Sequence, residues 1–286
     1  MATQSVLIAQ DTSTDAAWRV WGLAIHNALV ALGTLVQTAD TGQANWATAT
    51  RAGTAYEMWR FNDALQSTAP VYIKFLFGTS GSQPQLTIQA TTGTNGAGTL
   101  TGNGTFAWAA NLTFTATAQQ YYFSSTTSRL TMWMEADASH GAGGNGAIWT
   151  FERPHDNAGA ETGTGIVGAF AWNGTSTYQV AWGRQGASLP AFVGINMSDA
   201  AIVDQQATLI GSQMTAFTLN PVGVNHQVQN PLLGMLLYWS SDLGVGVPGT
   251  IPTVTIYGTA HTYINTNASP SSFAINANYR AMMLYE

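Results

Sequence analysis

Apolar side chains recur at helical spacing close to the start of the chain. Trp18, Trp21, Ile25 and Leu29 lie three or four residues apart and form one face of an amphipathic helix. A hydroxyl residue that can cap the helix precedes this face, and Gly33 follows it as a natural stop signal. The pattern therefore predicts one N-terminal helix that ends at about Gly33.

Two tryptophans on one short helix form a large apolar surface, and two packing partners for this surface are considered. The helix either covers a sheet of its own domain or packs against another subunit. In the second case Trp18, Trp21, Ile25 and Leu29 are the candidate assembly contacts. The repeat spans too few heptads to indicate a coiled coil.

From Thr34 onward the pattern changes to the alternation that is typical of strands. The segment 71–77 shows it best, because Val71, Ile73, Phe75 and Phe77 share one face. Similar short segments follow at regular intervals, separated by turns rich in Gly, Asn, Ser and Thr. The expected strands are 56–61, 71–77, 86–89, 105–108, 112–117, 129–135, 148–153, 166–172, 178–182, 191–195, 206–210, 214–219, 232–239, 253–257 and 279–285.

This succession of short strands predicts an all-β fold of the β-sandwich or jelly-roll-like kind, with an N-terminal amphipathic helix. We expect residues 1–40 to form an N-terminal arm and helix, and residues 41–286 to form one β-rich domain. A subdivision of that domain near residue 185 is the alternative.

The composition is unusual in its low charge. Only 8% of the 286 residues are charged, whereas roughly 25% is ordinary. With 10 Trp, 10 Tyr and 11 Phe the chain has ample apolar surface to bury, which argues against disorder. Neutral polar surfaces suit contacts between neighbouring copies, where burying charge is costly. A β-rich protein with neutral loops would have the same composition.

Charge and apolar run length exclude further classes. The net charge is −6 and Lys74 is the single lysine, so a basic patch that neutralises many phosphates cannot form, and we expect no nucleic-acid partner. Apolar runs reach only the length of a strand, which predicts no membrane span. The chain has no cysteine, and its N-terminus lacks the basic and apolar regions of a signal peptide.

Motifs for catalysis or cofactor binding are missing, and the five histidines are scattered. The loop around Glu152 and Asp156 offers oxygen ligands for calcium, but Arg153 lies inside it and favours a structural turn. A glycosidase pair drawn from Glu135, Asp137 and Glu152 has no support beyond the presence of carboxylates. We therefore expect a non-enzyme without catalytic residues, cofactor or metal.

The aromatic residues allow a second class of function. Tryptophan rings exposed on a β-sheet stack on sugars, although most aromatic side chains lie in cores. Trp172 is the candidate for exposure, because it directly precedes a hairpin-like Asn-Gly turn. Further candidates for such a platform are Trp108, Trp133 and Trp182.

Three groups of segments together resemble a known family. The first is 18–21 with 37–43, the second is 56–66 with 71–74 and 95–100, and the third is 149–153 with 156–159 and 162–163. In this order they resemble tailed-bacteriophage virion proteins that are described as structural or tail proteins. The resemblance covers roughly residues 15 to 165 and includes no catalytic motif.

The resemblance implies a component of the virion, made in the host cytoplasm. We expect a homo-oligomeric capsid-decoration or tail/baseplate protein whose partners are copies of itself and other virion proteins. The alternative is an adhesin module that binds a carbohydrate on the host surface.

Overall fold

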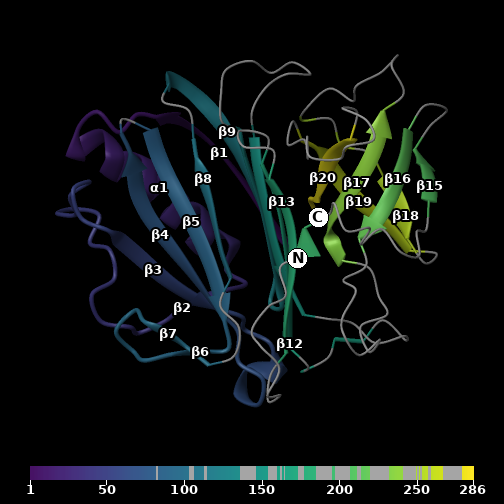
Figure 1. Cartoon of the computed structure of the whole chain (residues 1–286), viewed down its shortest axis with the longest axis horizontal. Coiled ribbons are helices and arrows are strands. Elements are labelled where there is room, and N and C mark those ends of the chain that lie inside the picture. The colour runs from purple at the N-terminus through teal and green to yellow at the C-terminus, as the bar shows by residue number, and fades with distance from the viewer. Residues whose placement is uncertain are drawn as a thin grey trace.

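The computed structural model contains one α-helix, one short 3-10 helix and several antiparallel sheets in its described part (Figure 1). The structure describes residues 1–81, 83–102, 106–112, 115–135, 146–153, 160–161, 163, 165–172, 177–184, 195–196, 207–210, 214–219, 232–240, 249, 251, 253–256, 259–266 and 279–286. The described part of the chain is thus all-β apart from its N-terminal helix and a single 3-10 turn.

Three sheets form three layers, and the seven-stranded sheet is the central one (Figure 1). Its strands, in spatial order, are β1 (Ala2–Gln10), β9 (Thr115–Thr126), β10 (Arg129–Glu135), β11 (Gly146–Glu152), β12 (Gly165–Trp172), β13 (Thr177–Arg184) and β14 (Ile195–Asn196). Both β10 and β11 are buried along their whole length, because another sheet covers each face.

The five-stranded sheet packs on one face of the central sheet. It consists of β2 (Val36–Gln37), β3 (Ala55–Arg60), β4 (Tyr72–Ser80), β5 (Gln83–Thr91) and β8 (Phe106–Asn111), and a small hairpin of β6 (Gly93–Thr94) and β7 (Leu100–Thr101) lies beside it. Burial alternates along β4 and β5, so that Ile73, Phe75 and Phe77 point into the core with Leu86 and Ile88. Consecutive described strands pair in an up-and-down order.

The six-stranded sheet covers the other face of the central sheet. Its order is β15 (Ala207–Ile210), β16 (Met214–Leu219), β17 (Leu232–Ser240), β20 (Tyr279–Leu284), β19 (Thr259–Asn265) and β18 (Thr253–Ile256). Gly234 of β17 lies so close to Thr150 and Thr131 that an added Cβ would stand 1.9 Å from the Thr150 hydroxyl. The absence of a side chain at this glycine lets the two sheets approach.

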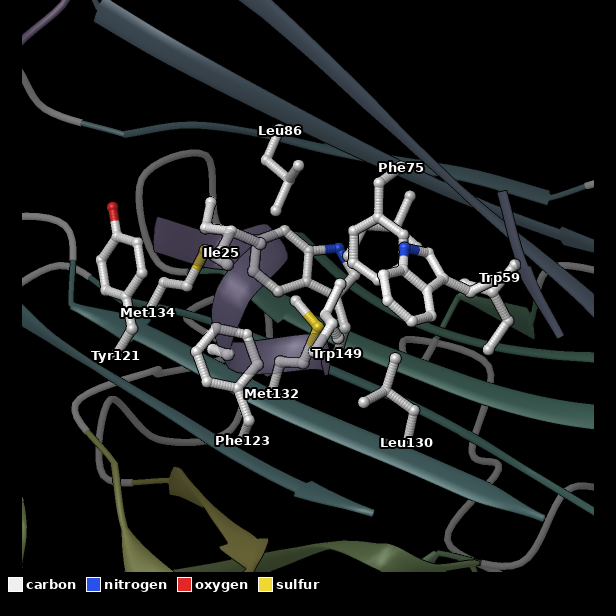
Figure 2. Close-up of a cluster of buried hydrophobic side chains, with 14 of the residues drawn as sticks. Ile25, Trp59, Phe75, Leu86, Tyr121, Phe123, Leu130, Met132, Met134 and Trp149 are labelled. Carbon is white, nitrogen blue, oxygen red and sulfur yellow. The ribbon is translucent and has the colours of Figure 1, made fainter. Parts of the chain in front are cut away.

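Helix α1 (Asp15–Leu32) lies along the side of the core between the five- and seven-stranded sheets (Figure 2). The Thr14 hydroxyl accepts a hydrogen bond from the Ala17 amide at 3.1 Å and caps its N-terminus. Gly33 ends it with φ 66°, and its amide donates to the carbonyl of Val30. A 3-10 turn, η1 (Ala64–Ser67), connects β3 to β4.

The N-terminal segment is built into this structure. Strand β1 pairs along its length with β9, and α1 closes the core beside it. The segment 1–40 therefore shares one hydrophobic core with the sheets that follow it. No helix in the described part of the chain has the length and hydropathy to cross a membrane.

Candidate functional site

The apolar stripe predicted on α1 lies inside the molecule. Trp18, Trp21, Ile25 and Leu29 are fully buried against the chain's own sheets, as in the first of the two arrangements considered for the helix. The Trp21 indole N–H donates to the hydroxyl of Tyr121 on β9 at 3.0 Å. In this structure the four side chains are thus occupied within the chain, and a neighbour cannot reach them.

Trp46 completes this contact and depends on a glycine. Its ring packs on Trp18 and Phe77 with centroid separations of 5.5 and 4.8 Å. The ring lies directly over Gly22 of α1, where an added Cβ would stand 2.1 Å from it. Any larger residue at position 22 would therefore displace the tryptophan.

A buried carboxylate links α1 to β3. Glu57 is fully buried and accepts hydrogen bonds from the indole N–H groups of Trp46, at 2.6 Å, and Trp59, at 3.1 Å. His26 Nδ1 lies 2.8 Å from the same carboxylate. The hydrogen bond with Glu57 raises the pKa of His26, and partial burial opposes this shift. The cluster therefore connects α1 to β3, and the strength of this connection depends on the charge of His26.

Two other polar contacts join segments that lie far apart in the sequence. At the first, the Lys74 ammonium donates to the carbonyl of Gly98 at 2.6 Å and lies 4.8 Å from the centre of the Tyr56 ring. The Asp40 carboxylate accepts from the Gly98 amide at 3.1 Å and from the hydroxyl of Thr94. These bonds hold the hairpin of β6 and β7 on the sheet.

Burial and hydrogen bonds shift the pKa values of both charged groups at this contact. Burial would raise the pKa of Asp40, but hydrogen bonds from Thr38, Thr94 and Gly98 outweigh it and lower the pKa below its ordinary value. Burial lowers the pKa of Lys74, and the charge of Asp40 partly offsets that effect. Asp40 is nearly inaccessible, so the pair serves to fix the hairpin.

The second contact joins Arg153, just after β11, to the loop before η1. The guanidinium is buried and forms two hydrogen bonds with the Asp63 carboxylate, at 2.6 and 3.0 Å. A third goes to the carbonyl of Ala69 at 2.6 Å. Residues 154–157 of the candidate calcium loop lie outside the described residues. Within them, Arg153 takes part in an internal ion pair.

The carboxylates considered for a glycosidase pair have structural partners. The carboxylate of Glu152 accepts the backbone N–H groups of Leu233 and Gly234 at 2.8 and 2.9 Å. The Glu135 carboxylate accepts a hydrogen bond from the backbone N–H of Gln120 at 3.1 Å. Asp137 lies outside the described residues. The two described carboxylates thus stabilise strand contacts.

The tryptophans considered as a sugar platform divide into two groups. Trp133 is buried and stacks on Tyr122 at 5.0 Å, beneath the six-stranded sheet. Trp172 is the last residue of β12, opposite Ala147 and Thr177, and its side chain lies outside the described part of the structure. The same is true of the side chains of Trp108 and Trp182.

A shallow pocket of about 360 Å³ opens on the outward face of the five-stranded sheet. Arg51, Leu76, Gln85 and Thr87 are among its lining residues, which include no aromatic ring. Such a lining offers hydrogen bonds to a small polar molecule, but no flat surface on which a sugar would stack.

The outward side of α1 is the feature that the sequence interpretation missed. Val20, Leu23 and Val30 are 62%, 39% and 53% exposed, and the exposed Ala16 and Asn27 lie in the same stripe. These five positions alternate steps of four and three residues, which places them on one face of the helix. Their spacing is a detectable signal, although the two tryptophans of the buried stripe dominate the pattern.

The outer edge of β1 adjoins this helix. Within the described residues β1 pairs with β9 alone, so its other edge has no strand beside it. The strand is nine residues long and contains no charged residue and no proline. Leu7, at 65% exposed, points away from the core. Together, the open edge of β1 and the outward stripe of α1 form an uncharged surface, here called the β1–α1 surface.

No protein-family model, curated protein or solved structure matches the chain. Among the described residues, the β1–α1 surface is the region where an unpaired strand edge and exposed apolar side chains favour binding of a partner.

Proposed function

We propose that the chain is a non-enzymatic structural subunit of a tailed-phage virion, at a capsid-decoration or tail/baseplate position. It is made in the host cytoplasm and held in the particle by copies of itself and other virion proteins. The β1–α1 surface carries this proposal. An uncharged open strand edge beside exposed apolar side chains is a liability for a monomer, and a partner in an assembly removes it.

The use of the charged side chains supports the same function. Glu57, Glu152 and Arg153 are buried, and each holds two structural elements together. The resemblance to virion proteins rests on segments that meet at the Arg153–Asp63 and Lys74–Gly98 contacts. These contacts connect separate elements of the fold, as a structural protein requires.

The proposal includes a β-sandwich assignment for the five- and seven-stranded sheets. It rests on their facing each other across one apolar core that α1 closes at the side. In these two sheets β2 to β5 and β9 to β14 pair in up-and-down order, whereas β1 pairs with β9. A jelly-roll order stays a prediction.

Particles of the phage that encodes this chain provide the test. We expect quantitative mass spectrometry of gradient-purified virions to find the intact chain in a fixed ratio to the major capsid protein. A chain that remains in the soluble fraction of the lysate contradicts the proposal. Binding of the purified chain to a glycan array, abolished by Trp172→Ala, would instead favour the carbohydrate-binding adhesin.

A further inference from the structure

We propose that two copies of the chain join edge to edge through β1, so that their seven-stranded sheets form one continuous sheet across a two-fold axis. This proposal names the partner of the β1–α1 surface, and it rests on the proposed function as an assembling subunit. The occupant of the surface is thus a second copy of the same strand and helix.

The open edge of β1 specifies a strand as its partner. Every second residue of an edge strand directs a backbone N–H and C=O outward, and another strand satisfies them as a row. Natural edges avoid this pairing by lysines, prolines, inward charges or bulges. The stretch from Ala2 to Ala9 has none of these, and its pairing with β9 becomes irregular only between Ala9 and Gln10.

Symmetry explains why the second strand is β1 itself. A strand pairs with its own copy in antiparallel fashion about a two-fold axis perpendicular to the sheet, so one edge serves both copies. Two pairings of seven residues fit the regular part of β1, namely residues 2–8 centred on Ser5 and residues 3–9 centred on Val6. We choose the first, because Ser5 is exposed whereas Val6 is partly buried. Ser5 of both copies then lies at the axis, and Leu7 lies opposite Thr3 of the second copy.

The same two-fold symmetry also buries the outward stripe of α1. A two-fold perpendicular to the sheet keeps like faces together, so both helices lie on the same face of the joined sheet. Because α1 packs chiefly on β1, and less on β9, it lies at the edge that the axis passes. Val20 and Leu23 therefore approach the same residues of the second helix. The strand edge and the helix stripe thus become buried in one step.

The size of the contact sets the expected strength. A nine-residue strand and an 18-residue helix are both about 30 Å long, and a strand with a helix beside it is about 15 Å wide. The projected contact is then about 450 Å² per copy, or about 900 Å² for both. This is close to the lower limit for specific interfaces, so we expect a dissociation constant in the micromolar range.

Light scattering with size-exclusion chromatography measures the mass. The monomer has 30.2 kDa, and we expect the mass to rise toward 60.4 kDa (twice 30.2) as the concentration approaches about 100 μM. Ser5→Lys sets two like charges opposite each other at the axis and should raise the dissociation constant about tenfold or more. Ile251→Lys is the control, because Ile251 is also exposed and lies outside the surface. It should leave the dissociation constant unchanged.

An engineered disulfide can locate the axis. The natural chain has no cysteine, so a single introduced cysteine can cross-link only with the same residue of a second copy. Opposed residues of antiparallel strands have Cα separations that a disulfide spans. We expect Ser5→Cys to give a cross-linked dimer under mild oxidation, whereas Ile251→Cys stays monomeric. A wild-type chain that remains monomeric at about 100 μM overturns the proposal. So does a trimer, or equal cross-linking of the two variants.

Failure of this dimer and failure of the virion assignment give different results. A chain that is present in purified virions but neither dimerises nor cross-links at Ser5→Cys contradicts only the dimer. A chain that dimerises through Ser5→Cys but is missing from the virions contradicts only the virion assignment.

Discussion

At the scale of single residues, Gly22 determines how closely Trp46 packs on α1. In an exposed helix, Gly→Ala would stabilise the protein by up to about 1 kcal/mol. Here the new Cβ would meet a ring that Glu57 and Phe77 hold in place. We therefore expect Gly22→Ala to lower the free energy of unfolding by about 1–3 kcal/mol in urea titrations.

Asn27→Ala, on the exposed face of the same helix, is the matched control and should leave stability nearly unchanged or slightly higher. Equal stabilisation by both substitutions would contradict the close contact between Gly22 and Trp46.

His26 adds a pH dependence to the same cluster. Its pKa is raised in the folded state, chiefly by the hydrogen bond with Glu57. A raised pKa contributes stability that is complete below the unfolded value of about 6.5 and is lost as the pH rises through the folded value. The stability difference between wild type and His26→Gln should therefore shrink as the pH rises above about 6.5.

Urea midpoints at several pH values measure this difference. Ala31→Gln controls for a glutamine on the helix surface, and its difference from wild type should stay constant over the same range. A wild-type advantage over His26→Gln that grows with pH would have the wrong sign for this ion pair.

At the scale of elements, Glu152 joins the central sheet to the six-stranded sheet. Its carboxylate accepts two adjacent backbone N–H groups of β17. In Glu152→Gln the amide nitrogen would face one of these donors, which costs about 1–3 kcal/mol for the lost bond. We expect faster hydrogen exchange at β17 and a lower melting temperature. Glu161→Gln alters an exposed carboxylate that accepts a hydrogen bond from Ser128 and should leave hydrogen exchange at β17 unchanged, whereas an equal effect at β17 would exclude a specific role for Glu152.

Elements differ in how well the sequence predicts them. Helix α1 and β10 match their predicted positions, because the helix has an unbroken apolar stripe and β10 a compact apolar run. Strand β1 was not predicted, because it forms by pairing with β9, more than a hundred residues away. The prediction for β9 ended at Thr117, since polar Gln and Ser residues interrupt the apolar alternation around Tyr121 and Phe123.

The candidate site was predictable only in part. The stripe of Val20, Leu23 and Val30 is visible in the spacing of the sequence, but its exposure follows from which side of α1 meets the sheets. The open edge of β1 depends on the order of all strands in its sheet. The local sequence pattern does not determine the order of strands in a sheet. It also does not determine how the three sheets stack.

At the scale of the whole molecule, the N-terminal segment is part of the core rather than an attachment to it. Deleting residues 1–33 would remove Ile8, Trp18, Trp21, Ile25 and Leu29 from one continuous apolar cluster. Losing a single buried tryptophan side chain costs about 3–5 kcal/mol, and whole domains are stable by about 5–15 kcal/mol. We therefore expect the deleted chain to lose its cooperative unfolding transition and its near-ultraviolet circular dichroism.

Trp21→Phe keeps an aromatic ring but loses the hydrogen bond to Tyr121, and it should still fold, with a free energy of unfolding lower by about 1–3 kcal/mol. A deleted chain that unfolds cooperatively at the wild-type midpoint would mean that α1 and β1 are dispensable for the core, and the N-terminal segment would then be a separable arm.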